Sequence, residues 1–330
     1  MVGKTKNKMS FLYLFNSIIL GHKAIVLIII FVVVLSILSP VFLTQRNLLN
    51  VLRQVCVNAI LACGFVLILG NGGVDLSCGS IIGITGVSMA LMMRAGMPFY
   101  YAIPLAMLIG GVAGSANGAL IVFFKLPPFI ITLGMQQVLR GATYLLTKHQ
   151  PITGLPAEFV WIGQGHIGVI PFPIFVMLAV VIIMWIIINR TKFGRYVLAV
   201  GGNTEAARVS GINVGLVRIG AYMTIGMVAA IAAAVMCARA ASAQPAGGFG
   251  MEMEAIAAGV IGGSRMVGGN ANIVGAFLGA VIVGLLNNGL NLLGIDASWQ
   301  IIAKGLLILF AMTLDSTSTM ILGKLKIQQS

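Results

Sequence analysis

Long apolar runs recur along the whole 330-residue chain and restrict it to one class of fold. Hydrophobic residues make up 59% of the sequence and charged residues only 8%, whereas a typical soluble domain has about 25% charged residues. The 20 basic and 7 acidic side chains cannot cover the surface of a soluble protein of this size. This excludes soluble enzymes, disordered chains and secreted disulfide-linked scaffolds. The sequence predicts an all-α polytopic membrane protein.

About 20 apolar residues cross a bilayer as one helix. On this measure ten spans are predicted within a single transmembrane domain, residues 1–330. They are 24–43, 51–70, 78–93, 99–124, 127–147, 172–189, 216–240, 252–264, 271–292 and 298–316. Short or broken helices are predicted near 71–80 and 247–264, where glycines and polar residues interrupt the apolar sequence.

The distribution of Lys and Arg predicts the orientation of these spans. With the N-terminus inside, 13 of the 20 basic residues fall on the inner side, including Lys4, Lys6, Lys8, Lys324 and Lys326. Basic residues collect on the cytoplasmic side of membrane proteins. Both termini are therefore predicted to be cytoplasmic. The positive charge is scattered between apolar runs rather than gathered on a domain, so no nucleic-acid partner is expected.

Five positions recur at an offset of 171 residues. Asn117-Gly118, Ile130-Ile131 and Gly134 match Asn288-Gly289, Ile301-Ile302 and Gly305. Five spans separate the two halves, approximately 24–147 and 172–316, so the halves would insert with opposite orientation. We therefore predict two inverted five-helix repeats, an arrangement common in transporters. Chance alignment of Gly-rich apolar sequence is the alternative.

The first Gly-rich segment, residues 71–80, carries an acid at membrane depth. Asp75 and Ser77 can simply cap the helix that starts near Cys78. The alternative is functional, because a carboxylate within the membrane is costly unless it is paired or faces water. On that interpretation Asp75 and Ser77 belong to a translocation path or gate.

Further amides lie inside the predicted spans. Asn58, Asn117, Gln136, Asn288 and Asn291 are assigned to the same path or gate, since amides both donate to and accept from sugar hydroxyls. Hydrogen bonding to a neighbouring helix is the commoner role for such residues. Two cations, Arg140 and Lys304, also fall within spans and are expected near water or a partner acid.

The second Gly-rich segment, residues 247–254, carries Glu252 and Glu254. These acids favour the N-terminal end of the eighth span through its helix dipole. No histidine, nucleophile or metal-ligand set accompanies them, so catalytic residues, metals and cofactors are not predicted. The spans also lack the chain of acids or histidines that a proton relay needs.

A short helix is predicted inside the cytoplasmic loop, residues 190–215. Asn203 or Thr204 can cap it, and Glu205 lies in its first turn, where the dipole favours an acid. Gly211 follows where a helix would stop. A compact helix of this kind is suited to docking into the cleft of another protein.

Several separated motifs resemble one known family, the ribose-type ABC importer permeases. Glu205-Ala206-Ala207 with Arg208 and Gly211 resembles the EAA-type coupling loop, although the proline that ends the broader consensus is absent. Residues 72–80, Gly-Gly-Val-Asp-Leu-Ser-Cys-Gly-Ser, resemble the family's Gly-Gly-Ile-Asp-Leu-Ser-Val-Gly-Ser signature. Further matches lie at 242–245, 254–258, 262–263, 287–294, 299–300 and 304–305, so the resemblance covers roughly residues 40–315.

The resemblance implies the membrane subunit of an ATP-driven monosaccharide importer in a bacterial cytoplasmic membrane. It implies a second permease copy, a cytoplasmic ATP-binding subunit on the coupling loop and an extracytoplasmic sugar-binding protein. The chain itself has no GxxxxGK[ST] phosphate loop, so ATP hydrolysis is expected on the separate subunit. A permease for a nucleoside, an amino acid or a furanone signal remains an alternative, as does an ion-coupled secondary transporter. The sequence does not select the sugar.

Overall fold

The computed structural model describes residues 23–296, 298–307, 309 and 313, and it is mostly helical. The elements are α2 (Lys23–Leu38), α3 (Gln45–Gly70), α4 (Cys78–Arg94), α5 (Phe99–Phe124), α6 (Pro128–Thr147), α7 (Ala157–Gln164), β1 (His166–Ile167), β2 (Ile170–Pro171), α8 (Phe172–Arg190), α9 (Lys192–Gly202), α10 (Thr204–Val209), α11 (Val214–Ala240), α12 (Met251–Ile261) and α13 (Ile273–Leu292). Residues 298–307 are also helical.

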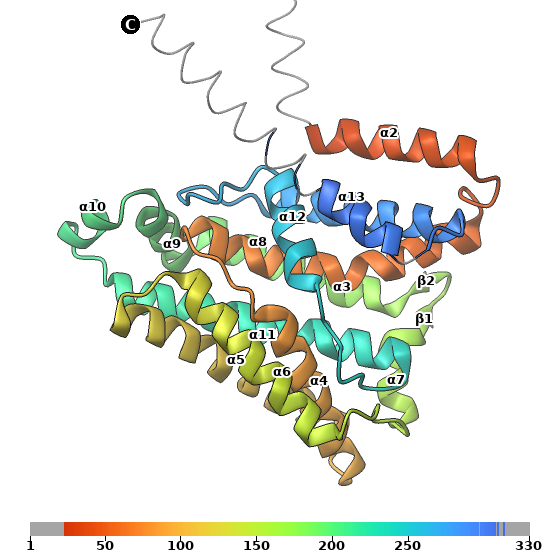
Figure 1. The fold of residues 1–330 in the computed structure, drawn as a ribbon, viewed down its shortest axis with the longest axis horizontal. Helices are drawn as coiled ribbons and strands as arrows, with labels where there is room; N and C mark the ends of the chain where they lie inside the picture. Colours follow the sequence, from red (N-terminus) through yellow and green to blue (C-terminus); the bar gives the residue numbers. More distant parts are fainter. Residues whose placement is uncertain (1–22, 297, 308, 310–312, 314–330) are drawn as a thin grey trace, which may run out of the picture.

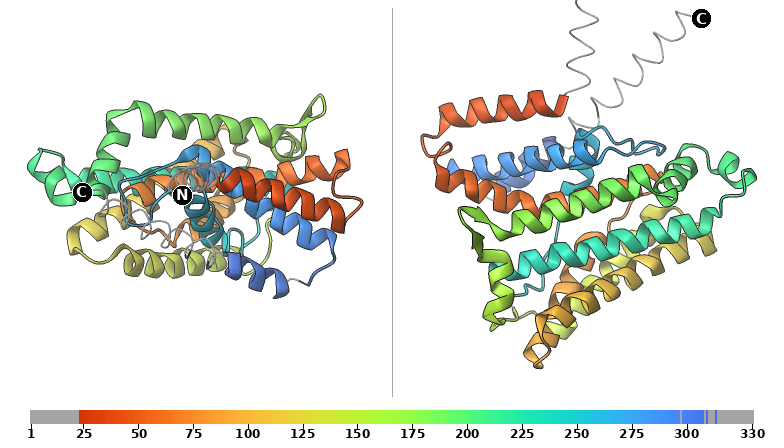
Figure 2. Two further views of the ribbon diagram at one scale, coloured as in Figure 1. Left: turned by 90° about the horizontal axis from the view of Figure 1, so that it is seen from above. Right: turned by 180° about the vertical axis from the view of Figure 1, so that it is seen from behind.

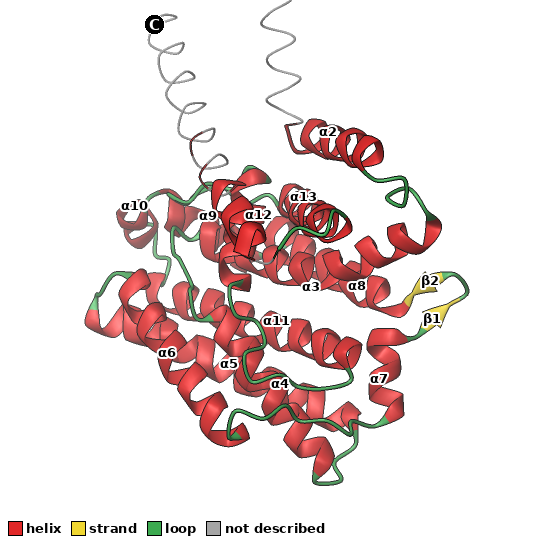
Figure 3. Ribbon diagram, turned by 45° about the vertical axis from the view of Figure 1, so that its right-hand side comes forward, coloured by secondary structure: helices red, strands yellow, loops and turns green. Residues whose placement is uncertain are grey.

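Five of the described helices are long and apolar enough to cross a membrane: α3, α5, α8, α11 and α13. The predicted shortness of the third and eighth spans is confirmed, because α4 has 17 residues and α12 has 11. The predicted all-α class holds apart from β1 and β2, two strands of two residues each that pair antiparallel and are drawn in yellow in Figure 3.

The two longest polar stretches, residues 148–171 and 190–215, lie at opposite ends of the helical bundle. Figure 1 shows α9 and α10 at one end of the long helices, and α7 with the β1–β2 hairpin at the other. Figure 2 shows from behind that α2 and α13 stack along one side of the bundle. The predicted separation of residues 148–171 from residues 190–215 is therefore seen in the fold.

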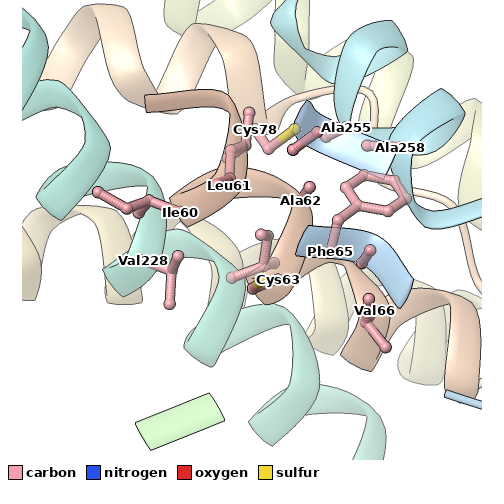
Figure 4. Close-up of a cluster of buried hydrophobic side chains, with 14 of the residues drawn as sticks. Ile60, Leu61, Ala62, Cys63, Phe65, Val66, Cys78, Val228, Ala255 and Ala258 are labelled. Carbon is pink, nitrogen blue, oxygen red and sulfur yellow. The ribbon is translucent and has the colours of Figure 1, made fainter. Parts of the chain in front are cut away.

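The core surrounds α3, which is buried over most of its length from Val55 to Gly70. Figure 4 shows Leu61 and Phe65 of α3 among side chains from α11 and α12, including Val228 and Ala258. Ile60, Leu61 and Phe65 are each fully buried. Residues 59–70 of α3 are apolar on every face and have no stripe for solvent, which is why this part of the helix occupies the centre.

Small residues bring α5 and α11 into backbone contact. A Cβ at Gly110 would overlap the carbonyl oxygen of Gly226, and one at Gly114 would overlap that of Tyr222. Gly279 of α13 meets Ala258 of α12 in the same way. The glycine stripes thus serve packing within one chain, since small residues permit the close approach of helices.

Several predicted boundaries change. The first span was placed at 24–43, but α2 ends at Leu38, two residues before Pro40, because a proline disfavours helical backbone in the residue preceding it. In contrast, α3 begins at Gln45, where the Thr44 side chain accepts from the Asn47 N–H. The helices α7 and α9 were not predicted. The end of the tenth span, the N-terminal lysines Lys4, Lys6 and Lys8, and Lys324 and Lys326 lie outside the described residues.

Candidate functional site

The first Gly-rich segment breaks the chain as predicted. The helix α3 ends at Gly70, Gly72 takes a φ of +71°, and α4 begins at Cys78. Figure 1 shows the extended connection that leads from α3 into the middle of the bundle. This part of the chain is largely buried, so its polar groups need partners from the protein.

Asp75 is completely buried at the centre of that segment. Its Oδ1 accepts from the Ser77 backbone N–H at 2.8 Å and from the Ser77 hydroxyl at 2.6 Å. Asn117 of α5 donates to the same hydroxyl oxygen at 2.7 Å. Asp75, Ser77 and Asn117 therefore form one hydrogen-bonded group. Ser77 holds the N-cap position of α4 without a side-chain cap bond, so the capping carboxylate is that of Asp75.

The second Gly-rich segment is held by α6. Arg140 donates to the carbonyl oxygens of Pro245 at 3.1 Å and Gly247 at 2.8 Å. Gln136, one turn away, donates to Oε1 of Glu252 at 2.9 Å. Arg140 was expected near water or a partner acid. Its hydrogen bonds go to backbone carbonyls, and Glu252 lies close enough to interact with it electrostatically.

The two Gly-rich segments contact each other. A Cβ at Gly79 would overlap both Oε2 of Glu252 and the carbonyl oxygen of Gly248. Gly248 has a φ of +77° and Gly250 a φ of +79°, conformations that glycine adopts without strain. The first turns of α4 and α12 thus meet inside the bundle. Short helices whose starts converge inside a bundle are typical of transporter binding sites.

A polar cavity of about 380 Å³ lies beside the start of α12. It is lined by Gln54, Val57, Asn58, Met236, Arg239, Met251, Glu254, Asn287, Asn291, Gln300 and Lys304. Glu254 is its central acid: Oε2 accepts from Asn58 at 2.6 Å, and Oε1 pairs with the Lys304 ammonium at 2.6 Å. The expectation that Lys304 has a partner acid is confirmed.

The predicted coupling helix is α10, which presents a charged outer face. The Asn203 side chain caps it by accepting from the Ala206 N–H at 2.9 Å. Glu205 and Arg208 form an ion pair at 3.3 Å on its exposed surface, whereas Ala207 is buried beneath them.

The end of α10 is closed by a Schellman motif. The Gly211 N–H bonds the Arg208 carbonyl at 3.0 Å, and the Ile212 N–H bonds that of Ala207 at 3.1 Å. Gly211 has a φ of +83°, which confirms the predicted stop.

Comparisons with known proteins place this arrangement in a family. The model described as "Branched-chain amino acid transport system / permease component" matches residues 47–312. The ribose import permease protein of Bacillus subtilis is 42% identical over 288 residues, which is 87% of this chain and 89% of that protein. The chain belongs to the ribose-type family of ABC importer permeases.

Other relatives align with this chain over nearly its whole length. The ribose import permease protein of Escherichia coli K12 is 38% identical over 308 residues, covering 92% of this chain and 96% of that protein. The galactose/methyl galactoside import permease protein of the same organism is 34% identical, covering 94% and 97%. No solved structure matches the chain.

The predicted path residues of the permease fall into four places. Asn58 and Asn291 line the polar cavity, and Asn291 accepts from Gln300 at 2.9 Å. Gln136 contacts Glu252, and Asp75, Ser77 and Asn117 form the buried group described above. Asn288 lies apart from the cavity lining, since it exchanges hydrogen bonds with Asn47 of α3 at 2.9 and 3.1 Å.

Several cavity residues were not assigned to the path from sequence, namely Gln54, Arg239, Glu254, Asn287, Gln300 and Lys304. The sequence carried a signal for two of them. Lys304 is a cation within one apolar span, and Glu254 is an acid at the start of a different span. Two opposite charges in apolar surroundings favour an ion pair between them, even 50 positions apart. Gln54, Asn287 and Gln300 gave no comparable signal, because amides on a helix look alike in sequence until the direction in which each helix face points is known.

Proposed function

We propose that this permease is the membrane-spanning subunit of an ATP-driven importer, and that its polar cavity forms part of the path of a monosaccharide. The polar cavity is the observation that carries the proposal. The ribose and galactose permeases among its relatives support the substrate class. ATP hydrolysis takes place on a separate subunit, and an extracytoplasmic binding protein delivers the sugar.

The chemistry of the cavity suits a polyhydroxylated solute. Eight of its eleven lining residues are polar: Gln54, Asn58, Arg239, Glu254, Asn287, Asn291, Gln300 and Lys304. Amides offer both donors and acceptors, and a carboxylate accepts from hydroxyl groups. The matching family model names branched-chain amino acids, whose side chains require apolar contacts. The lining offers only Val57, Met236 and Met251 for that purpose, so a sugar is favoured.

The inverted repeat is part of the same proposal. Its support is a set of corresponding helix contacts: α5 packs on α11 as α13 packs on α3, and α4 packs on α5 as α12 packs on α13. Exchanging the two halves maps these contacts onto one another, whereas the contacts of α3 with α8 and of α2 with α13 have no counterpart of similar extent. Ten spans with both termini cytoplasmic, pairing of two permease copies and surrounding lipid complete the architecture that we propose.

The coupling element of the proposal is α10 with Gly211. Glu205, Ala206 and Arg208 are exposed on it, while Ala207 anchors it to the bundle. A rigid capped helix transmits displacement without deforming, which is why we assign it to the ATP-binding subunit.

The experiment is uptake into vesicles that contain the permease, its ATP-binding subunit and its binding protein. Labelled ribose, galactose, a nucleoside and leucine are compared. We expect ATP-dependent uptake of one of the sugars. Uptake that persists without ATP and is lost when an ion gradient is dissipated would overturn the proposal. Uptake of leucine alone would show that the substrate is an amino acid rather than a sugar.

A matched pair of variants on α13 tests the cavity itself. Asn291→Ala removes an amide that lines the cavity, whereas Asn288→Ala removes one that pairs with Asn47 instead. We expect Asn291→Ala to change the apparent KM or the sugar preference. Asn288→Ala is expected to lower the unfolding temperature and leave the sugar preference unchanged. Equal effects on sugar preference would remove the cavity from the path.

A further inference from the structure

A second, larger hollow lies next to α10, at the opposite ends of α3 and α11 from the polar cavity. We call it the basic pocket. Its volume is about 540 Å³, and it is lined by Asn71, Gly72, Gly73, Ile121, Val122, Lys125, Leu126, Pro128, Arg208, Ile212, Asn213, Val214, Gly215, Arg218 and Tyr222. No residue is shared between the two linings. The proposed sugar path does not use this pocket.

Three cations from three different elements line the basic pocket. Lys125 follows the last residue of α5, Arg208 comes from α10 and Arg218 from α11. No acidic residue is among the lining residues. Arg208 is partly neutralised by Glu205, but Lys125 and Arg218 form no ion pair among the described residues. The pocket therefore holds an excess of positive charge.

The walls supply further groups of matching chemistry. The first turn of α11 reaches the pocket at Val214 and Gly215, and amide groups at a helix start favour an anion. On the other side, Ile121, Val122 and Leu126 give an apolar wall. Phe123 and Phe124 next to it are 79% and 56% exposed. Basic pockets bordered by apolar helix surface are suited to anionic lipid headgroups.

We propose that the basic pocket binds a phosphate group, carried either by an anionic phospholipid or by a soluble phosphate compound. The bound phosphate would join the ends of α5, α10 and α11 by charge-assisted hydrogen bonds. The pocket also reaches Gly72 and Gly73, so the ligand lies between the proposed coupling helix and the first Gly-rich segment. Binding would thereby connect the two elements without contacting the sugar.

The test is a binding titration of the purified full-length permease in a neutral detergent, followed by thermophoresis. The probes are dioctanoyl phosphatidylglycerol, dioctanoyl phosphatidylcholine and inorganic phosphate. We expect saturable binding of phosphatidylglycerol that exceeds that of phosphatidylcholine and weakens with added salt. Saturable binding of inorganic phosphate would identify a soluble source instead. Binding of neither anionic probe, or equal binding of the two lipids, would overturn the proposal.

Variants locate the site. Lys125→Gln/Arg218→Gln removes two pocket charges, and we expect it to weaken binding of the anionic probe about tenfold or more. Lys192→Gln/Arg195→Gln removes two charges from α9, at the same end of the bundle and outside the pocket lining. This control is expected to bind within about twofold of the wild type. Equal weakening by both double variants would show nonspecific attraction and overturn the site.

A single variant guards against misfolding. Arg218 also contacts the Thr204 hydroxyl at 3.5 Å, so its loss disturbs local structure. Lys125 is exposed, and Lys125→Gln leaves the backbone free to keep its conformation. We expect Lys125→Gln alone to keep the unfolding temperature of the unliganded protein and to weaken binding of the anionic probe about threefold to tenfold. Undiminished binding by this folded variant would contradict the proposal.

Discussion

Gly79, at the start of α4, lies directly against the carboxylate of Glu252, at the start of α12. Any side chain at position 79 would overlap Oε2 of that carboxylate. This contact joins two segments that are more than 170 residues apart in the sequence. It also places the starts of two short helices side by side within the bundle.

Gly79→Ala should disrupt that junction. The added Cβ forces apart Glu252 and the Gly248 backbone, which neighbouring contacts hold in place, and overpacking of this kind costs about 1–3 kcal/mol. We expect a lower unfolding temperature and reduced uptake. Gly134→Ala on α6 is the control, since nothing lies within 4 Å of its added Cβ. If both variants unfold at the same temperature, the proposed close contact between Gly79 and Glu252 is contradicted.

Lys304→Met should leave Glu254 without its cationic partner. The pair is largely shielded from solvent, with side-chain exposures of 31% for Lys304 and 14% for Glu254. An unpaired buried group costs about 1–3 kcal/mol, so stability and uptake should both fall. The double variant Glu254→Gln/Lys304→Met should recover stability but not uptake. The unfolding temperature and the sugar uptake are measured for the same preparations of both variants. Recovered uptake in the double variant would show that the ion pair has only a structural role.

Gly211→Ala should uncouple ATP hydrolysis from transport. Its φ of +83° strains any residue with a Cβ, at a cost of about 1 kcal/mol. The strain would displace the end of α10. Gly96→Ala is the matched control, because Gly96 has a φ of +91° and open space around it, after α4 rather than α10. The measurement is the ratio of ATP hydrolysed to sugar imported. An unchanged ratio in Gly211→Ala contradicts the coupling assignment.

Asp75→Ala should impair folding or uptake, and Asp75→Asn should separate the reasons. The amide oxygen of asparagine can still accept from the Ser77 N–H and hydroxyl, so capping of α4 is retained while the charge is lost. If Asp75 acts only as a cap, Asp75→Asn should import sugar at nearly the wild-type rate. If its charge acts in the path, both variants should lose uptake while Asp75→Asn keeps its unfolding temperature. Normal uptake by Asp75→Ala would exclude a role of the charge in the path and leave only the capping role.

Local sequence predicted a good part of this fold. Apolar runs placed the long helices, because burying about 20 apolar residues in lipid depends on composition alone. Glycine content predicted where the chain breaks before α4 and α12. The caps of α10 were also readable, since Asn203 and Gly211 act on groups within a few residues of themselves.

Partners distant in the sequence could not be predicted in the same way. Asn288 and Asn291 are amides on one helix, yet one pairs with Asn47 and the other lines the polar cavity. Which role each takes depends on the rotation of α13 against α3, and that rotation is set by packing over the whole interface.

The sequence by itself therefore determined that the chain lies in a membrane, where its long helices and their breaks fall, and which family it belongs to. These follow from transfer of side chains into lipid and from backbone preferences, both of which act over short stretches. Only the tertiary structure decided that Glu252 contacts Gly79, that Glu254 pairs with Lys304 and that three cations border one pocket. Such contacts depend on how helices far apart in the chain fit together, and the close packing of their side chains settles that fit.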